Sequence, residues 1–339
     1  MSQPTLFELP VVPDVKPDTA TLLPFDEYDR CVISYSGGKD STALVAWALG
    51  YFDRSRIELW HQDVDADAPL MDWPCTPAYV RAVACALGLN VRFQWKVGGF
   101  EGEMTRREKF TNPVRFELPD GTIGQAGGTS GKLATREKFP QVSADLKVRW
   151  CSPYLKIDPA ATAMRNDPSM REGKFLFLTG ERRQESTARS KYAKTELHRC
   201  NSERRLVHQH RAIIDLPENR VWDEHRALGI IPHPAYRIGY PRLSCQHCIF
   251  QDADQCATNR KISPVEFARI EEYERQFGVT VKRGCTLGQL ADKGTCYEGS
   301  RDAALVALAL NRAYPEAVMI GSKNWTTPAG AYKRGGGPT

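Results

Sequence analysis

The 339-residue sequence has no apolar run that approaches the length of a membrane-spanning helix, and its N-terminus lacks the basic-then-apolar pattern of a signal peptide. We also find no internal repeat. The missing membrane and export signals make the cytoplasm the expected location. In that compartment, ten cysteines indicate thiol or metal chemistry rather than a disulfide framework.

Two common phosphate-binding motifs are absent from the Gly-rich turn near the N-terminus. The turn has neither the G-x-x-x-x-G-K-[ST] spacing of a Walker A loop nor the G-x-G-x-x-G spacing of a dinucleotide site. Residues 36–41 instead read SGGKDS, after a hydrophobic run and before an apolar stretch at helical spacing. Glycine lets the backbone approach a ligand, and free N–H groups, two hydroxyls and a lysine favour an anion. The turn is therefore predicted to hold phosphate.

Apolar β-rich runs alternate with helical patterns, which is typical of a parallel sheet flanked by helices. Strands are predicted at 30–36, 56–62, 91–97, 174–179 and 212–216, and helices at 40–51, 77–87, 159–165 and 185–192. The Pro-rich residues 1–27 are predicted to be an extended arm before the domain. Residues 28–244 then form the α/β domain, with an insertion near the site at about 99–147 and a hairpin at Asp120-Gly121.

The character of the sequence changes at Cys245, and residues 245–339 are predicted to be a helical, cysteine-bearing C-terminal region. Ser263 is a predicted N-cap, Pro264 takes the first helical position and Glu266 completes a capping box. A second helix is predicted at 301–313.

Residues 182–211 carry nine Lys and Arg against three Glu, a surplus larger than the net charge of +5 of the whole chain. Arg182, Arg183 and Arg189 surround Ser186 directly after a predicted strand. Arginine forks bind phosphate, sulfate or carboxylate oxygens bidentately, so we expect an anion site here, with a solvated basic helix as the alternative. Asp63 ends the second strand, where open sheets bind ligands, and is expected to contact ribose, Mg²⁺ or solvent.

The cysteines cluster in one loop. Cys245-x-x-Cys248 is followed by Cys256, and Cys151 is the expected fourth ligand from across the fold. Four sulfurs suit a [4Fe–4S] cluster or zinc, and the sequence does not choose between them. A redox dithiol or unrelated buried thiols are the alternative interpretations. Two further cysteines are substitutes for one ligand: Cys285 and Cys296.

Residues 36–41 resemble the pyrophosphate loop of the PP-loop ATP pyrophosphatase superfamily, in which ATP is split to AMP and pyrophosphate while a substrate oxygen is adenylylated. TGERRQESTARSKY (179–192) resembles the G-x-R-R-x-x-S-x-x-R signature of the phosphoadenosine phosphosulfate (PAPS) reductase-like branch. Residues 212–248 resemble the segment of that branch that runs from a strand through a V-W helix and P-x-x-x-G-Y into a C-x-x-C. The resemblance covers roughly residues 28–250 and implies a doubly wound, mostly parallel α/β sheet.

The same resemblance implies ATP and Mg²⁺ as ligands. The implied ATP-binding residues are Ser36, Gly37, Gly38, Lys39, Asp40, Ser41, Asp63, Gly180, Ser186 and Arg189. The implied catalytic residues are Lys39, Asp40, Arg182 and Arg183.

Two departures count against the sulfonucleotide reductases of this branch. Their C-terminal E-C-G-[LI]-H motif is missing from residues 249–339, and Trp150 precedes a lone Cys151 where iron–sulfur members have a Cys-Cys pair. The chain instead resembles the DNA phosphorothioation enzymes of the Dnd and Ssp systems. The shared R-W-C-x-x-x-x-K-I pattern is carried by Arg149, Trp150, Cys151, Lys156 and Ile157.

This second resemblance implies a sulfurtransferase that adenylylates a DNA backbone phosphate for sulfur insertion. It implies three kinds of partner, namely DNA, a cysteine desulfurase as sulfur donor, and other subunits of an antiphage or modification system. Residues 182–211 are expected to hold the DNA backbone, together with Arg106, Arg107, Lys109 and Arg115. Three other functions stay open: a sulfonucleotide reductase, a tRNA thiolase, and a non-catalytic, metal-stabilised nucleic-acid-binding module.

Overall fold

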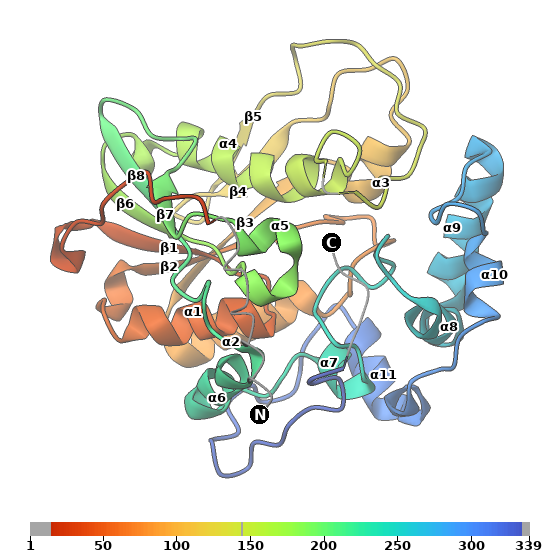
Figure 1. The fold of residues 1–339 in the computed structure, drawn as a ribbon. Helices are drawn as coiled ribbons and strands as arrows, with labels where there is room; N and C mark the ends of the chain where they lie inside the picture. Colours follow the sequence, from red (N-terminus) through yellow and green to blue (C-terminus); the bar gives the residue numbers. More distant parts are fainter. Residues whose placement is uncertain (1–14, 144, 334–339) are drawn as a thin grey trace, which may run out of the picture.

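The computed structural model describes residues 15–143 and 145–333, so part of the expected arm lies outside the described residues. This part of the chain has an α/β fold, in which helices pack around one mixed, mostly parallel sheet of eight strands (Figure 1). In spatial order the strands are β5 Ile123–Ala126, β4 Val114–Glu117, β3 Asn90–Lys96, β2 Ile57–Asp63, β1 Arg30–Ser34, β6 Gly173–Leu178, β8 Arg205–His210 and β7 Thr195–Leu197.

The helices connect and cover these strands. They are α1 Lys39–Leu49, α2 Thr76–Leu87, α3 Gly99–Met104, α4 Asp158–Asn166, α5 Thr187–Ser190, α6 Glu218–Leu228, α7 Pro234–Ile238, α8 Ala253–Ile262, α9 Pro264–Phe277, α10 Leu287–Ala291 and α11 Ala303–Leu310. A π-helical turn at Pro153–Ile157 runs directly into α4. No helix in the described part of the chain is long and apolar enough to cross a membrane.

Successive side chains of a strand point to opposite faces of the sheet, so the strands contribute to two apolar layers, one on each face. Ile33 of β1 belongs to a core shared with α1, α2 and α6, whereas the neighbouring Val32 packs in a second core under α4. Figure 1 shows α1, α2 and α6 on one face of the sheet and α4 on the other. Both faces are therefore covered, which explains the nearly continuous apolar run of β1.

The five central strands β3-β2-β1-β6-β8 are parallel, while β4, β5 and β7 pair antiparallel at the two edges. The predicted hairpin at Asp120-Gly121 is confirmed, because it joins β4 to β5 with Gly121 at φ +82°. The predicted insertion thus extends the sheet by two strands.

The predicted strand at 212–216 is wrong, and the strand that pairs with β6 is β8 instead. Residues 212–216 form turns, in which Ile214 N donates to Arg211 O. Ile213 and Ile214 are both buried, Ile213 in the core next to the sheet, and neither belongs to the ladder. β8 reads RLVHQH, and its polar residues conceal the strand pattern because its carboxyl end, at Gln209, lines a cavity.

Three predicted helical features differ in detail. The predicted helix at 185–192 is a 3₁₀ turn followed by the four-residue α5, and the predicted helix at 301–313 is the shorter α11. Ser263 is the N-cap of α9 and Pro264 its first residue, as predicted. The capping box is wrong, because Ser263 Oγ donates to the Glu266 side chain at 2.6 Å instead of accepting from the backbone.

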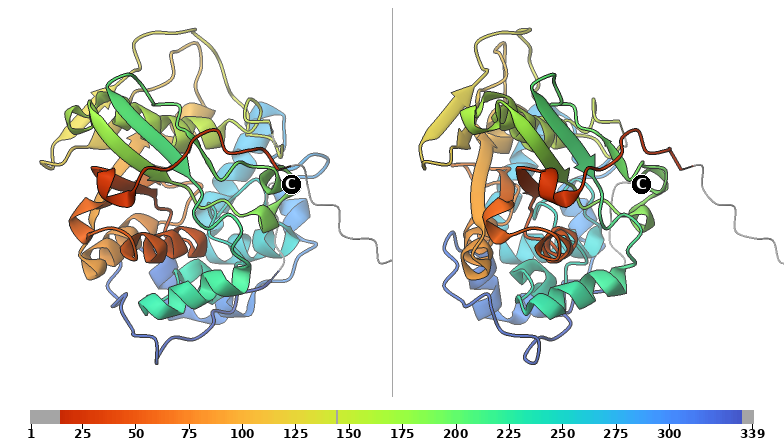
Figure 2. Two further views of the ribbon diagram at one scale, coloured as in Figure 1. Left: turned by 60° about the vertical axis from the view of Figure 1, so that its left-hand side comes forward. Right: turned by 90° about the vertical axis from the view of Figure 1, so that its left-hand side faces the viewer.

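The described part of the N-terminal arm runs along the β7 edge of the sheet (Figure 2, dark red). Lys16 N donates to Lys191 O at 3.0 Å, and Thr19 N donates to Thr195 O at 3.1 Å. Asp18 Oδ1 accepts hydrogen bonds from the backbone of Lys194 and Thr195. The arm is therefore tied to the segment that carries the arginine motif.

Candidate nucleotide-binding site and cysteine cluster

The turn at residues 36–41 lies where the strand order reverses. β1 lies between β2 and β6. The strands β2 and β3 follow on one side of β1, and β6 and β8 lie on its other side. The turn leaves the carboxyl end of β1, and Gly180 follows the carboxyl end of β6. A Cβ on Gly180 would lie 3.5 Å from Asp40, so the two segments are in contact. Open parallel sheets bind their ligands at this switch point.

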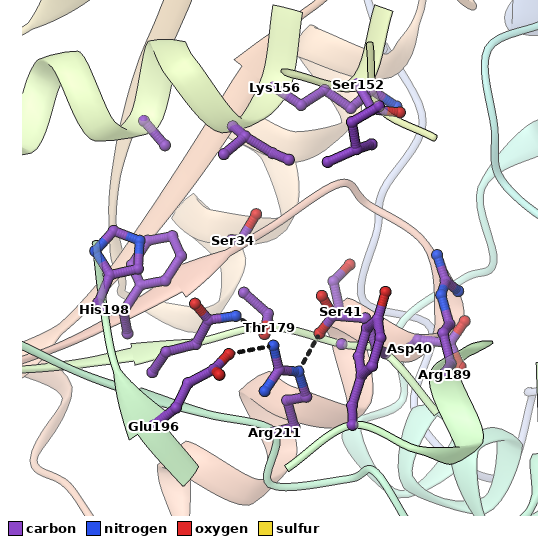
Figure 3. Close-up of a pocket in the computed structure, with 18 of the residues that line it drawn as sticks. Ser34, Asp40, Ser41, Ser152, Lys156, Thr179, Arg189, Glu196, His198 and Arg211 are labelled. Carbon is purple, nitrogen blue, oxygen red and sulfur yellow. Dashed lines mark hydrogen bonds and ion pairs between the residues drawn. The ribbon is translucent and has the colours of Figure 1, made fainter. Parts of the chain in front are cut away.

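A cavity of about 680 Å³ opens beside the turn (Figure 3). Its walls come from the turn, from the π-helical turn and α4, and from the segments around β7 and β8. The lining cations are Lys16, Arg149, Lys156, Arg189, Arg199 and Arg211, and the lining carboxylates are Asp40, Glu181 and Glu196. The volume is in the range of small-molecule sites, and the surplus of positive charge favours an anionic ligand.

The turn brings its hydroxyl and backbone N–H groups together. Ser36 Oγ and Ser41 Oγ are 3.2 Å apart, and Ser36 N donates to Ser41 Oγ at 3.3 Å. Gly37 has φ +77°, a left-handed conformation that glycine adopts without strain. Gly38 is the N-cap of α1 and offers no capping side chain, while the Tyr236 hydroxyl accepts from Lys39 N, the first N–H of the helix, at 3.1 Å. The positive end of the α1 dipole therefore faces the turn, as an anion site requires.

Lys39, in contrast, is not among the residues that line the cavity. It is 5% exposed, and its Nζ lies 3.5 Å from Glu218 Oε1 and 3.8 Å from Asp40 Oδ2. Its Nζ also donates to Pro241 O at 3.4 Å and lies 5.8 Å from the Tyr236 ring centre. Burial lowers the pKa of Lys39, but Tyr236 and Asp40 outweigh burial and the pKa is raised overall. The lysine is charged and held behind the turn.

The first two arginines of the basic motif are engaged within the protein. Arg182 is 3% exposed, and its Nε donates to Asp40 Oδ1 at 2.5 Å. Arg183 Nε donates to Asp215 Oδ1 at 2.7 Å, and its Nη1 donates to the carbonyls of Ser190 and Tyr192. Neither arginine lines the cavity, so both position the motif rather than face the ligand space.

The later part of the motif does reach the cavity. Gly180, Ser186 and Arg189 line it, as the resemblance implied. Ser186 Oγ accepts from Arg189 N at 3.2 Å and caps α5, while Arg189 Nη1 pairs with Glu185. Figure 3 shows Arg189 beside Asp40 and Ser41. The turn and the arginine motif, far apart in sequence, thus share one wall.

Asp63 lies outside the cavity lining, although its neighbour Gln62 belongs to it. Asp63 Oδ1 accepts hydrogen bonds from Asp65 N and Ala66 N, at 3.2 and 2.9 Å. Burial raises the pKa of Asp63 to about 6. The side chain therefore organises the turn after β2, and no contact from it into the ligand space is present.

The four predicted ligand cysteines all pack in or against one apolar cluster below the cavity. Cys256 is buried within this cluster, and Cys151, Cys245 and Cys248 pack against it. Burial raises the pKa of Cys151 to about 11 and of Cys256 to about 12, with the charge of Cys248 also raising that of Cys151. All four thiols are free.

The donor chemistry of this cluster fits an iron–sulfur or zinc centre, but the present arrangement is not closed. Among the described residues, no three His, Cys, Asp or Glu side chains are arranged to hold a metal ion. Cys256 Sγ instead donates to Leu287 O at 3.3 Å. A metal site would need Cys256 to turn away from that carbonyl, so the metal assignment stays a prediction.

Lys156 connects the cavity with the cysteines. It lines the cavity, and negative charge on Cys245 is the largest cause of its raised pKa, followed by Asp72. Burial raises the pKa of Asp72 to about 7, against the opposing effect of Lys156. A π-helical turn is rare and often marks functional residues, and here it carries Lys156.

Four residues on the far side of the cavity were not singled out from the sequence, although they lie in the basic segment 182–211: Glu196, His198, Gln209 and Arg211. They belong to β7, β8 and the residues that follow these strands. The available signal was the alternation of polar residues in RLVHQH, which reads as a strand only when His and Gln are allowed to face a cavity.

No protein-family model matches the chain. Residues of this chain are 29% identical, over 283 residues, to the "uncharacterized 37.8 kDa protein in gpa 5′ region" of Escherichia phage 186. The likeness covers 77% of this chain and 79% of the phage protein. The relative has no described activity, so the functional argument rests on the site.

Proposed function

We propose that this protein is a PP-loop ATP pyrophosphatase that adenylylates a DNA backbone phosphate so that sulfur can be inserted. The observation that carries the proposal is the position of residues 36–41. They join β1 to the N-terminus of α1, where Gly38 offers no capping side chain, at the switch point of the sheet, and they open into a cation-rich cavity. A triphosphate is the ligand that best matches this combination of helix dipole, hydroxyls and surplus positive charge.

The reaction assigns different tasks to the two sides of the turn. The β- and γ-phosphates lie on Ser36, Ser41 and the N–H groups of α1, with Mg²⁺ offsetting their charge. A non-bridging oxygen of the DNA phosphate attacks the α-phosphorus, a new P–O bond forms, and the bond to the β-phosphate breaks to release pyrophosphate. The terminal sulfur of a persulfide on the partner desulfurase then attacks the adenylylated DNA phosphorus, a P–S bond forms, and AMP leaves. A thiol reductant then cleaves the S–S bond between this sulfur and the desulfurase, which frees the DNA phosphorothioate and the desulfurase thiol.

The charged residues around the turn support this chemistry in two ways. Arg189 lines the cavity next to Asp40 and contributes a donor fork for phosphate oxygens. Arg182 keeps Asp40 paired, and Glu218 keeps Lys39 behind the turn until an anion draws its ammonium forward. Arg182 and Arg183 therefore act by positioning other residues and do not contact the reacting phosphates themselves.

DNA reaches this cavity across the basic segment at 182–211 and the insertion at 99–147. Arg107 and Arg115 are exposed, and their only side-chain partners among the described residues are Glu137 and Gln125, which a phosphate can replace. Arg106 is not, because its guanidinium is paired with buried Glu103 and donates to Lys109 O. Fewer residues of the insertion are therefore proposed to contact DNA than the sequence alone suggests.

Cys151, Cys245, Cys248 and Cys256 would hold the proposed [4Fe–4S] cluster or zinc ion. When bound, such a centre supplies sulfur-ligated metal chemistry beside the cavity. The residues themselves fasten the C-terminal region to the wall that carries Lys156.

The proposal is tested by pyrophosphate release from ATP with anaerobically prepared protein, Mg²⁺, DNA, a cysteine desulfurase and partner subunits. The double variant Lys39→Ala/Ser41→Ala should lose turnover. The matched control Ser322→Ala/Lys323→Ala, which changes the same residue types at exposed positions outside the cavity, should keep it. Equal ATP turnover in the two double variants would refute the loop assignment.

The molecule in which sulfur is found distinguishes the proposed function from the other candidate functions. We expect sulfur in digested DNA, detected by mass spectrometry as a phosphorothioate dinucleotide. Sulfur in tRNA would instead assign the protein to the thiolases. Sulfite released from an adenylyl sulfate with thioredoxin would assign it to the reductases.

A further inference from the structure

The cavity continues away from the phosphate-binding turn to an end with a different chemistry. Figure 3 shows His198 and Glu196 on the side opposite Asp40 and Ser41. Phe177, from β6, lines this end as well, and its ring centre lies 4.9 Å from that of His198. This end is therefore aromatic, whereas the turn side is built for phosphates.

His198 is a neutral ring with a defined tautomer. It is 8% exposed, and burial, followed by the charge of Arg199, lowers its pKa to about 4. Its Nδ1 accepts a hydrogen bond from Cys200 N at 3.3 Å, so the proton of the neutral ring is on Nε2. His198 thus adds one N–H donor to the aromatic end.

Two acceptors stand side by side on the neighbouring strands. Glu196 of β7 and Gln209 of β8 are directly paired across the ladder, and both line the cavity. Glu196 Oε1 accepts from Arg211 Nη2 at 2.7 Å, and Gln209 Nε2 donates to Thr179 Oγ1 at 3.3 Å. These bonds fix both side chains. In the described part of the chain no donor reaches Glu196 Oε2 or Gln209 Oε1.

We propose that this end of the cavity is a nucleobase subsite that takes an unstacked base of the DNA acceptor and prefers bases with an exocyclic amino group. The inference rests on the proposed function, since it places a base next to the phosphate that is activated. The Phe177–His198 pair offers aromatic surface to a base, as single-strand-binding proteins do. The base lies at one end of the cavity and the triphosphate at the other.

The polar groups account for the preference. An exocyclic amino group has two N–H donors, one for Glu196 Oε2 and one for Gln209 Oε1, and cytosine N3 accepts from His198 Nε2. Thymine has a single N–H on the same edge and would leave one of these two acceptors without a donor. Glu196 and Gln209 are partly exposed to water in the free protein. A bound base would cover both acceptors, and an acceptor that loses water without gaining a donor is costly, so thymine should be disfavoured.

The experiment measures fluorescence anisotropy of short single-stranded oligodeoxycytidine and oligothymidine, with a non-hydrolysable ATP analogue present throughout. The wild-type protein should bind oligodeoxycytidine about fivefold or more tightly. Gln209→Leu should remove this preference. Phe177→Leu should weaken both oligonucleotides about tenfold and keep the preference. The control Gln276→Leu, at an exposed position on α9, should change neither.

The outcomes separate this inference from the proposed function. Loss of ATP affinity in Phe177→Leu and Gln209→Leu, with oligonucleotide binding unchanged, would make this end the adenine pocket and overturn the inference. ATP turnover without a base preference would also overturn it and leave the ATP pyrophosphatase standing. A base preference without ATP turnover would support the subsite and reject the proposed function.

A second measurement uses only the wild-type protein, so its result does not depend on whether the variants fold. Oligonucleotides with 5-iododeoxycytidine should crosslink on irradiation to the wild-type protein at Phe177 or His198, located by mass spectrometry of the peptides. Crosslinks confined to other parts of the chain would overturn the subsite.

Discussion

Arg182 and Asp40 are 142 positions apart in sequence, yet Arg182 Nε donates a 2.5 Å hydrogen bond to Asp40 Oδ1. Arg182 is almost fully buried, and Asp40 borders the cavity. The pair joins the turn at residues 36–41 to the arginine motif. A buried guanidinium needs a counter-charge, so a substitution of Asp40 in the turn also affects the arginine motif.

Asp40→Asn should therefore destabilise the fold, by about 3 kcal/mol, since it leaves buried Arg182 without its carboxylate. Urea denaturation measures this change. The double variant Asp40→Asn/Arg182→Met should recover part of the loss. Glu272→Gln, which breaks the exposed pair with Arg275, serves as the control and should cost under about 0.5 kcal/mol. Equal losses in Asp40→Asn and Glu272→Gln would contradict a buried ion pair.

Glu218→Gln should strengthen the binding of pyrophosphate and of ATP. Glu218 Oε1 lies 3.5 Å from Lys39 Nζ and competes with phosphate for the same ammonium. Removing that competition should lower KM for ATP severalfold and increase inhibition by pyrophosphate, with kcat changed less. Isothermal titration with pyrophosphate checks the binding directly. Glu224→Gln, on the same helix α6, is the control. Weaker binding in Glu218→Gln would mean that Glu218 holds Lys39 in its active position.

His225→Phe should stabilise the protein selectively at acidic pH. His225 is fully buried, and neither of its ring nitrogens has a hydrogen-bond partner in the described part of the chain. Burial lowers its pKa to about 4, below the value of about 6.5 for an exposed histidine. The unfolded state therefore binds more protons, so the contribution of His225 to stability is complete above pH 6.5 and is lost as the pH falls toward 4.

The expected difference is of the order of 2 kcal/mol more stabilisation at pH 5 than at pH 8. Chemical denaturation of both proteins at the two pH values measures it. A gain that is the same at pH 5 and pH 8 would show that packing, and not protonation of His225, determines the effect.

Anaerobically purified protein should be brown, with visible absorbance that disappears in Cys245→Ser/Cys248→Ser. Iron and sulfide analysis together with the absorbance spectrum provides the measurement. The control Cys85→Ser removes an exposed cysteine of α2 and should keep the colour. Stoichiometric zinc without iron would identify a structural site. Protein that contains neither metal would reject the cluster.

The central sheet could be predicted because its strands are buried on both faces and therefore read as apolar runs. β1, β2, β3 and β6 begin and end within two residues of their expected bounds. β8 could not be found in the same way, because His208, Gln209 and His210 interrupt the apolar pattern, while Ile213 and Ile214 imitate a strand. Tertiary packing decided between the two segments.

The candidate site was predictable where a motif carries it and unpredictable where folding creates it. Ser36, Ser41 and Arg189 come from local patterns and line the cavity. The retracted position of Lys39 depends on Glu218, which is 179 residues away, and no local pattern announces that pairing. Residue types in a motif specify which groups are near the ligand, but neighbours from other elements decide which groups face it.

The reversal of strand order at β1 has a consequence for biosynthesis. One wall of the cavity is made early and the other late, because Asp40 leaves the ribosome 142 residues before Arg182. A nascent chain that ends before β6 has the turn at residues 36–41 but lacks Arg182, which pairs with Asp40 in the complete protein. Under the proposed function, ATP would therefore act as a folding ligand only after the arginine motif has been synthesised, because the complete site does not exist before then.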